Sequence, residues 1–357
     1  MFSTSFVLSF FLLLSVPILL LLAPHILPPR QTLSIPREDE IDDLSLFRRA
    51  ASDSRHHSHL SSTNPKLKIA FLFLTNSDLY FAPLWERFFP SNRDLFNVYV
   101  HADPSVNVTH PRGVFENQFI SAKRTFRASP TLISATRRLI AHALIDDPAN
   151  AFFAVLSQYC IPLHSFHYVY DSIVSSRSFD SSTDESDTGL TQYGVRIRYK
   201  SFIEIISKES RLWKRYIARG RSALLPEVPF SKFRVGSQFF VLTRRHALMV
   251  IKDRALWKKF MLPCYRADEC YPEEHYFPTL LSMQDPEGCT RYSLTRVNWT
   301  GTTNGHPYTY SPSEVSPELI HELRKSNYSS SYLFARKFSP DCLRPLLKMA
   351  DKVIFRD

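Results

Sequence analysis

Two adjacent glutamates, Glu273 and Glu274, stand in the stretch Cys270-Tyr-Pro-Glu-Glu-His-Tyr-Phe-Pro-Thr279, together with a histidine and two tyrosines. Pro272 suits the first turn of a helix, where its missing N–H costs no hydrogen bond. The partial positive charge of a helix N-terminus favours carboxylates at these positions. A carboxylate held on a short buried helix can act as a general base. The alternative is that both glutamates only begin a helix.

Two adjacent cations, Arg336 and Lys337, interrupt the apolar run Leu333-Phe-Ala-Arg-Lys-Phe338, which is typical of a strand. A cation on a buried strand needs an anionic partner. One candidate partner is a nearby Asp or Glu. The other is the phosphate groups of a ligand, because arginine binds phosphate with two parallel hydrogen bonds and lysine binds it as a point charge.

His101 and Asp103 directly follow the apolar segment Phe96–Val100, which we expect to be a strand. In parallel sheets, ligands bind beyond the carboxyl ends of the strands. An aspartate at such a position can accept hydrogen bonds from a ribose or a base. The alternative is an Asx turn ahead of Pro104.

The elements that must position these groups follow from the hydrophobic pattern. Short apolar runs without polar alternation predict strands buried on both faces at 68–74 and 151–156, in addition to 96–100. Helical spacing and end signals predict helices at 79–89, from the Ser129-Pro130 cap to about 144, and from 244 to about 252. Strand, helix and strand in this order predict a parallel, doubly wound α/β sheet.

The remaining elements are expected as follows. A strand is predicted over Gly236–Thr243, and Phe277, Leu280 and Leu281 should bury one face of the helix after Pro272. The Ser/Asp-rich segment 177–191 is expected to be an exposed loop. Residues 195–230 are basic and aromatic, which we interpret as a solvated face, with an acceptor-binding surface as the alternative; the cations are Arg196, Arg198, Lys200, Arg211, Lys214 and Arg215.

Composition bounds the class of protein. The 357 residues are 44% hydrophobic, and 28 Phe and 16 Tyr against 8 Gly indicate a dense globular fold of one large or two modest domains. The formal net charge of +10 fits an anionic ligand or surface. Because the basic residues are scattered and no zinc-finger or RNP pattern occurs, nucleic acid is not expected as a partner.

The five cysteines include no C-x-x-C pair, so neither a zinc site nor a thioredoxin-like motif is indicated. Three N-glycosylation sequons begin at Asn107, Asn298 and Asn327, and they matter only if the domain enters the secretory lumen. In that compartment five cysteines allow two disulfides and one free thiol. The cysteines around the glutamate stretch leave the pairing open; they are Cys264, Cys270 and Cys289.

The N-terminus predicts a membrane anchor. The apolar run Phe6–Ala23 would form a helix about 27 Å long, close to the thickness of the hydrocarbon core. It lacks the basic flank and small-residue cleavage site of a signal peptide, which is the alternative. We therefore divide the chain into an anchor (1–23), a flexible Pro/Ser-rich stem (24–65) and a globular domain (66–357). A histidine cluster in the stem, at 56, 57 and 59, is expected to be solvated.

Several of these segments together resemble the core-2/I-branching β-1,6-N-acetylglucosaminyltransferase family, in particular its plant branch, to which peptide O-xylosyltransferases are related. The segments occur in the family's order and cover most of residues 66–350. They are 68–74, Tyr99-Val-His-Ala-Asp103, Leu156-Ser-Gln-Tyr-Cys-Ile-Pro162, 236–243, 270–279, Trp299 with His306-Pro307, and 333–338.

The resemblance implies a GT-A-like domain on a single-pass type II Golgi anchor. It also implies inverting transfer of a sugar, GlcNAc or a related one, from a UDP-sugar to a glycan or glycoprotein hydroxyl. Glu274 matches the family's catalytic base, and Glu273 replaces an aspartate and is one methylene longer. An altered choice of acceptor is one possible result of that difference. Ser157-Gln-Tyr-Cys160 stands where related proteins often carry an acidic residue, and the donor sugar stays open.

The resemblance also implies roles for the donor site. Asp103 matches an aspartate that contacts the nucleoside, Arg336 and Lys337 match the region that contacts the diphosphate, and Trp299 matches a tryptophan near the sugar and acceptor. Many GT-A enzymes hold a metal with Asp-x-Asp, which this sequence lacks. A fixed Arg-Lys pair can stabilise the same charge, so we predict neither metal nor cofactor beyond the UDP-sugar. The alternative is a catalytically inactive Golgi carbohydrate-binding or scaffold protein with the same fold.

Overall fold

The computed structural model describes residues 13, 15, 17, 34–56, 66–175, 177–180, 191–192, 195–301 and 305–357. Contacts divide the chain into two units, Met1–Leu33 and Ser34–Asp357, and the fold below is that of the second. The predicted anchor over 6–23 lies outside the described residues, apart from three single positions. Among the residues described, none of the helices combines the length and apolar character needed to span a membrane.

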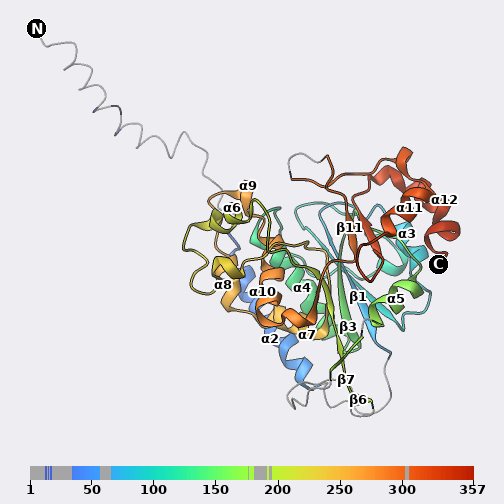
Figure 1. Cartoon of the computed structure of the whole chain (residues 1–357), viewed down its shortest axis with the longest axis horizontal. Coiled ribbons are helices and arrows are strands. Elements are labelled where there is room, and N and C mark those ends of the chain that lie inside the picture. Colours follow the sequence, from blue (N-terminus) through green and yellow to red (C-terminus); the bar gives the residue numbers. More distant parts are fainter. Residues whose placement is uncertain are drawn as a thin grey trace, which may run out of the picture. The chain divides into compact units, whose positions relative to one another are not determined.

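A six-stranded sheet forms the centre of the fold (Figure 1). Its order is β10 (Cys289–Arg291), β8 (Ser201–Glu204), β9 (Val241–Thr243), β3 (Asn150–Ser157), β1 (Lys68–Thr75) and β2 (Phe96–Ala102). β1 pairs in parallel with β2 and β3, and β10 with β8, whereas β9 is antiparallel to both of its neighbours. The predicted mixed α/β class with a mostly parallel sheet is confirmed and is consistent with a GT-A-like domain.

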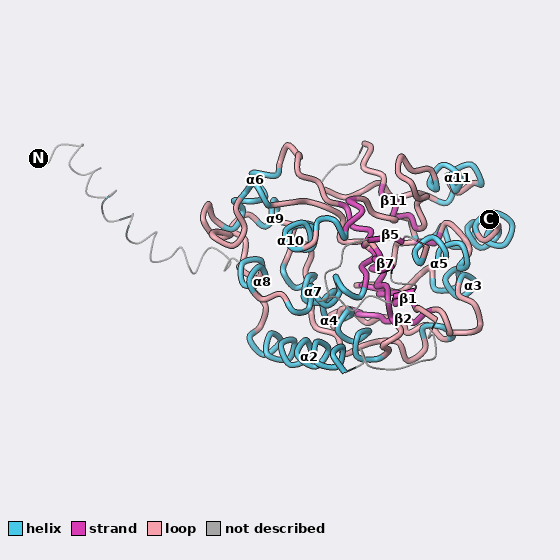
Figure 2. Tube along the Cα trace, turned by 60° about the horizontal axis from the view of Figure 1, so that its bottom comes forward, coloured by secondary structure: helices cyan, strands magenta, loops and turns pink. Residues whose placement is uncertain are grey.

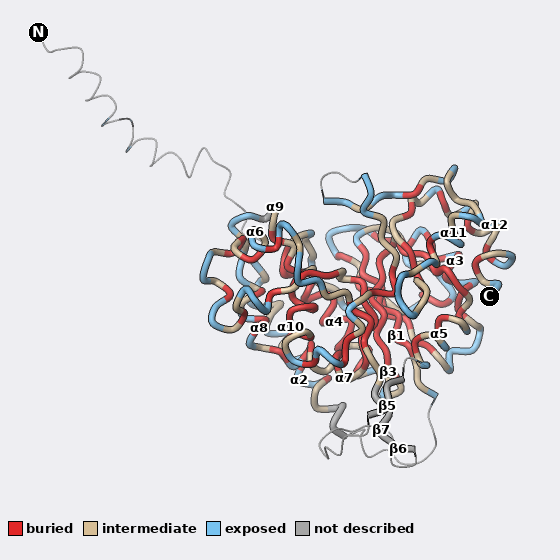
Figure 3. Tube along the Cα trace, viewed as in Figure 1, coloured by how far each residue is buried: buried red, intermediate tan, exposed pale blue. Residues whose placement is uncertain are grey.

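Helices cover both faces of the sheet (Figure 2). One face packs against α3 (Ala82–Phe88), α5 (Phe166–Val174), α11 (Pro317–Arg324) and α12 (Leu343–Met349). The other packs against α2 (Arg37–His56), α4 (Pro130–Asp146), α7 (Arg244–Lys252), α8 (Ala255–Phe260) and α10 (Tyr276–Gln284). Alternate residues of β1 enter the two cores, which explains why its sequence shows no polar alternation. Buried residues accordingly concentrate along the sheet (Figure 3).

Two helices begin where the sequence predicts, because their caps are local. Ser129 caps α4 by accepting a hydrogen bond from the backbone N–H of Thr131, and Pro130 occupies its first turn. Thr243 caps α7 by accepting from the backbone N–H of His246. The predicted strand over 236–243 is wrong for its first part, since only Val241–Thr243 joins the sheet.

The other elements are short. A three-stranded sheet contains β11 (Thr295–Val297), β12 (Phe334–Arg336) and β4 (Ile161–Pro162). A second contains β5 (Arg177–Asp180), β7 (Val195–Tyr199) and β6 (Thr191–Gln192), so the loop predicted over 177–191 is wrong at both ends. The remaining helical segments are α6 (Leu212–Tyr216), α9 (Ala267–Cys270), a π-helical turn at Ala350–Ile354, and 3-10 turns at Gly113–Phe115, Ile217–Arg219, Phe230–Lys232, Pro272–Glu274, Pro286–Gly288, Pro312–Glu314 and Pro340–Cys342.

Helix α2 corrects the expectation of a flexible stem over 24–65. It packs on α4, where Asp43 forms a buried ion pair with Arg138 and the ring of Phe47 lies 4.6 Å from the guanidinium of Arg137. Its buried positions are 43, 47 and 50, which are helically spaced. One of them is an aspartate, so the apolar period that marks a packed helix is missing from the sequence.

We expect a chain that starts at residue 66 to be less stable than one that starts at residue 34. Removing α2 takes the carboxylate of Asp43 away from Arg138 and uncovers the surface of α4 beneath it, whereas Asp43→Asn keeps Arg138 buried without its carboxylate, a loss of about 3–5 kcal/mol in the free energy of unfolding. Urea unfolding of the two truncated chains measures the difference, and Asp43→Asn in the longer chain isolates the ion pair. Equal unfolding midpoints for the two chains would contradict the packing of α2.

Candidate active site

A cavity of about 1130 Å³ opens along the carboxyl edge of the central sheet. Its wall includes the residues that follow β1 and β3, the end of β8, the approach to β9 and the residue after β10. These residues are Thr75, Asn76, Ser157, Gln158, Tyr159, Glu204, Phe239 and Tyr292. The expected location of a ligand site beyond the strand ends is therefore matched by a cavity.

The cavity brings together five of the residues selected from the sequence, although they come from three separate segments. Glu273 and Glu274 lie on the 3-10 turn before α10, Arg336 and Lys337 lie at the end of β12, and Trp299 follows β11. His101 and Asp103 do not line it.

Glu274 is held by its neighbours on both the main chain and the side chain. Its Oε2 accepts a hydrogen bond of 2.6 Å from Nη1 of Arg215 on α6. Its carbonyl accepts from the backbone N–H of Gly236, and its N–H donates to the carbonyl of Tyr271. The guanidinium of Arg215 also lies 5.3 Å from the ring of Tyr271. One carboxylate oxygen thus has a fixed cationic partner, and the group stays partly open to the cavity.

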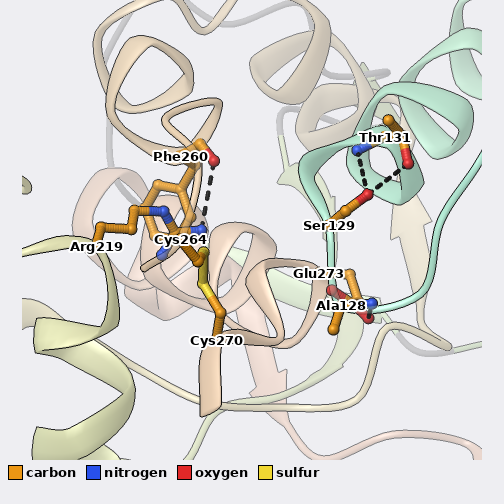
Figure 4. Close-up of a disulfide and its surroundings, with 8 residues drawn as sticks. All are labelled: Ala128, Ser129, Thr131, Arg219, Phe260, Cys264, Cys270 and Glu273. Carbon is orange, nitrogen blue, oxygen red and sulfur yellow. Dashed lines mark hydrogen bonds between the residues drawn. A yellow bond between two sulfur atoms is a disulfide. The ribbon is translucent and has the colours of Figure 1, made fainter. Parts of the chain in front are cut away.

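Glu273 is almost fully buried, with 4% of its surface exposed. Its Oε1 accepts a hydrogen bond from the backbone N–H of Ala128 (Figure 4), and its Oε2 has no partner among the described residues. Burial raises the pKa of Glu273 to about 8, and the nearby charge of Glu274 adds to the shift. At neutral pH this side chain is therefore mostly a protonated carboxylic acid that can donate from Oε2.

The shifted pKa predicts a pH-dependent stability. The folded chain holds the Glu273 proton more tightly than the unfolded chain, whose carboxyl titrates at its usual 4.5. The resulting stabilisation is complete below about pH 4.5 and is lost as pH rises through about 8. We expect Glu273→Gln to remove this loss, which is of the order of a few kcal/mol in the free energy of unfolding. Urea unfolding between pH 5 and 9 measures it, with surface Glu287→Gln as control; parallel pH profiles of wild type and Glu273→Gln would contradict it.

A disulfide between Cys264 and Cys270 directly precedes the glutamates (Figure 4). The loop that it closes is tied to the preceding helical turn, where the carbonyl of Ala218 accepts hydrogen bonds from the N–H groups of Tyr265 and Arg266. The sequence left this pairing open. The remaining cysteines are buried free thiols, so one of the two disulfides that five cysteines allow is formed; the free thiols are Cys160, Cys289 and Cys342.

Arg336 and Lys337 lie in the cavity wall without a carboxylate partner within 4.0 Å in the described part of the chain. The guanidinium of Arg336 lies 4.1 Å from the ring centre of Phe239, and Nζ of Lys337 lies 4.4 Å from that of Tyr159. Burial lowers the pKa of Lys337, and the charge of Arg336 lowers it further. Of the two partners that the sequence allowed, a protein carboxylate within 4.0 Å is thus absent from the described residues.

Arg127 adds a third cation that sequence reasoning missed. Its Nη1 lies 2.7 Å from Nε2 of His306, and its Nη2 donates to the carbonyl of Gly305. The pKa of His306 is lowered by burial and then by the charges of Arg127, Lys337 and Arg336, so the three cations share one region of the cavity. No local pattern marks Arg127, because its partners are 178 and 179 residues away.

The basic segment 195–230 also contributes to the cavity. Arg211 and Arg215 line it; Arg211 is exposed, as expected of a solvated face, and Arg215 is half-buried. Lys214, between them in the sequence, is exposed and lies outside the wall.

Asp103 and His101 lie at the carboxyl end of β2, as the sequence predicts, but neither lines the cavity. Asp103 is buried and accepts hydrogen bonds from the N–H and hydroxyl groups of both Ser105 and Thr125. Burial alone would raise the pKa of Asp103, but these bonds hold it below the usual value. Nε2 of His101 accepts from the N–H of Lys123, and burial lowers its pKa to about 4. The Asx turn weighed as the alternative is present, and both residues fix the 123–125 segment, whose Thr125 does line the cavity.

The three sequons differ in exposure. Asn107 and Asn327 are exposed, whereas Asn298 is half-buried and its side-chain amide donates to the hydroxyl of Tyr310. The residues that follow two of these asparagines, Trp299 and Tyr328, line the cavity. Within the described ranges, no group of three or more His, Cys, Asp or Glu side chains is placed to hold a metal ion.

The chain thus combines a mixed α/β domain with a cavity at the strand ends, and comparison with known proteins identifies its family. The chain belongs to the Core-2/I-Branching enzyme family, whose model matches residues 69–324, and it is therefore a member of a glycosyltransferase family. It is similar to Glycosyltransferase BC10 of Oryza sativa subsp. japonica, with 29% identity over 324 aligned positions that cover 76% of this chain and 74% of the relative. The family match includes both glutamates and ends before Arg336 and Lys337.

Proposed function

We propose that this chain is an inverting, metal-independent glycosyltransferase that moves a sugar, GlcNAc or a related one, from a UDP-sugar to a hydroxyl group of a glycan or glycoprotein. Family membership supports glycosyl transfer. The observation that carries the rest is the shared cavity, in which Glu274 and two cations without a carboxylate partner in the described residues, Arg336 and Lys337, are exposed to the same space.

In this proposal Glu274 is the general base. Its Oε1 takes the proton of the acceptor hydroxyl while the hydroxyl oxygen forms a bond to the anomeric carbon. The bond from that carbon to the diphosphate oxygen breaks on the opposite side, which inverts the configuration and releases UDP. Arg215 engages Oε2, so the other oxygen is the one assigned to the proton. Glu273 in its neutral form avoids a second negative charge beside it.

The departing diphosphate gains negative charge, which the cations stabilise. Arg336 can bind it with two hydrogen bonds, and Lys337 and Arg127 add charge from the same region. Three preorganised cations can meet the charge of a diphosphate without a divalent metal, and the absence of Asp-x-Asp from the sequence supports the same conclusion.

Calorimetric titration with UDP in excess EDTA tests the proposal. We expect UDP to bind at submillimolar concentrations, UMP to bind more weakly because it lacks the second phosphate, and EDTA to change neither. The absence of binding at millimolar UDP would favour the inactive carbohydrate-binding or scaffold protein. Binding or turnover that is lost in EDTA and restored by manganese would contradict metal independence.

The setting of the enzyme is also a proposal. We infer a single-pass type II Golgi membrane protein anchored by residues 6–23, on the strength of the apolar run and the family resemblance. A mature chain whose N-terminal sequence starts beyond residue 23 would contradict the uncleaved anchor. With the domain in the lumen, glycans would be expected at Asn107 and Asn327, which are exposed, before Asn298.

A further inference from the structure

We propose that the end of the cavity beside β10 is a subsite for a carbohydrate chain, in which a sugar of the acceptor, away from the reacting hydroxyl, stacks on Tyr328. The inference rests on the proposed function, because only a glycosyltransferase has an acceptor. It concerns a different part of the cavity and a different ligand from the nucleotide.

An aromatic stack extends from the core to this end of the cavity. Phe202 on β8 is buried, and its ring meets that of Tyr292 edge to face at 5.8 Å. The ring of Tyr292 lies parallel to that of Tyr328, with 4.3 Å between centres and 6° between planes. Tyr292 and Tyr328 line the cavity, and Tyr328 is 52% exposed. The outermost ring therefore presents a flat face that its own stack does not cover.

This ring is held in place before any ligand arrives. The hydroxyl of Tyr292 lies 3.1 Å from that of Ser329 and 3.3 Å from that of Ser330. The backbone N–H of Tyr328 donates to the hydroxyl of Ser326. Contacts at Ser326, Ser329 and Ser330 therefore fix the loop on both sides of Tyr328. A ligand that stacks on this ring loses little binding free energy to ordering the protein.

The order of the strands separates this stack from Lys337. Lys337 lies over Tyr159, which follows β3, whereas Tyr292 follows β10. Strands β9 and β8 separate β3 from β10, and three strand spacings amount to about 14 Å. Glu204, at the end of β8, lines the cavity between these two ends. The donor sugar takes up part of this separation next to the diphosphate, and an acceptor of more than one sugar would be needed to span the rest and reach Tyr328.

The chemistry of this end favours carbohydrate over peptide. The C–H groups on the flat side of a pyranose carry partial positive charge and pack on the negative face of an aromatic ring. Trp299 and Tyr332 add aromatic surface to the same cavity, and the guanidinium of Arg296 covers Tyr332 at 5.2 Å. The remaining wall carries hydrogen-bonding groups that match sugar hydroxyls, such as the carboxylate of Glu204.

The test measures binding of defined sugars to the full chain by saturation-transfer NMR in the presence of UDP. The probes are length series of one to five units of cello-, xylo- and N-acetyllactosamine oligosaccharides, with a serine-rich peptide as the alternative acceptor class. We expect at least one series to bind more tightly with length, and Tyr328→Ala to remove about tenfold of that gain. Tyr328→Phe, which keeps the ring, should retain it, and Asn327→Gln controls for a glycan at the adjacent sequon.

Each outcome bears on the inference. Affinity that does not depend on length in any series, peptide binding that Tyr328→Ala weakens instead, or a Tyr328→Ala chain that binds the longest probe as wild type does would overturn it. UDP affinity, measured on the same samples, should be unchanged by Tyr328→Ala. A chain that binds oligosaccharides through Tyr328 without binding UDP would keep the subsite and contradict the transferase, so the two failures are distinguishable.

Discussion

Replacement of Glu274 by glutamine is expected to abolish sugar transfer while UDP affinity changes by less than about twofold. Loss of a general base lowers turnover by about 10²- to 10⁴-fold. Glutamine has the same shape, and its side-chain oxygen can still accept the hydrogen bond from Arg215, so the surrounding wall should remain intact. Rates of transfer or donor hydrolysis over a panel of UDP-sugars, together with calorimetry of UDP, give both numbers.

The adjacent glutamate provides the matched control. Glu273→Gln preserves a side chain that can donate a hydrogen bond at neutral pH, as the protonated acid does, and we expect most of the activity at pH 7 to survive. A fully active Glu274→Gln enzyme would refute the assigned base. Equal loss in both variants would mean that the two carboxyl groups act as a unit rather than as a base and a neutral neighbour.

Neutralisation of the cations should act on the diphosphate. Lys337→Ala and Arg336→Gln each remove a charged contact that contributes about 1.5–3 kcal/mol, equivalent to about a 10- to 150-fold loss of UDP affinity. Glutamine is preferred at 336 because the arginine packs on Phe239, and a smaller residue would leave a void. Calorimetry with UDP, UMP and uridine measures the effect, which should be largest for UDP and absent for uridine.

Lys214→Ala is the control for this pair, since Lys214 is exposed and does not line the cavity. Its UDP affinity should equal that of the wild type. If Lys337→Ala weakens uridine as much as UDP, the cations support the fold rather than the diphosphate. If neither Lys337→Ala nor Arg336→Gln alters the affinity for UDP, UMP or uridine, the donor lies elsewhere.

The elements that could be predicted from sequence are those fixed by local patterns. Strand β1 follows from an unbroken apolar run, and α4 and α7 follow from Ser129 and Thr243 at their caps. Helix α2 was missed because Asp43 occupies a core-facing position, where only its distant partner Arg138 makes a charge tolerable. A hydrophobic pattern shows that a position is charged, but it does not show that a distant residue will pair with that charge.

For the candidate site, too, individual residues could be predicted from the sequence, whereas contacts between distant segments could not. Glu274, Arg336 and Lys337 were selected because they are charged within apolar surroundings, and one cavity unites them. Neither the place of Arg127 in the cavity nor the pairing of Arg215 with Glu274 could be predicted, since these contacts join segments 179 and 59 residues apart. Asp103 was placed at the correct strand end, but four hydrogen bonds from within the fold occupy its carboxylate.

The contact between Arg215 and Glu274 bears on how such an enzyme would avoid hydrolysis of its UDP-sugar by water. In the role proposed for Glu274, Oε2 is already engaged by the guanidinium of Arg215, so the proton must be delivered to Oε1 by a hydroxyl group aligned with that one oxygen. An acceptor sugar, held by several contacts, can supply a well-aligned hydroxyl to Oε1, whereas a lone water cannot. Hydrolysis of the donor sugar by water would then be slow in the enzyme without acceptor. Transfer would begin only when an acceptor glycan is bound.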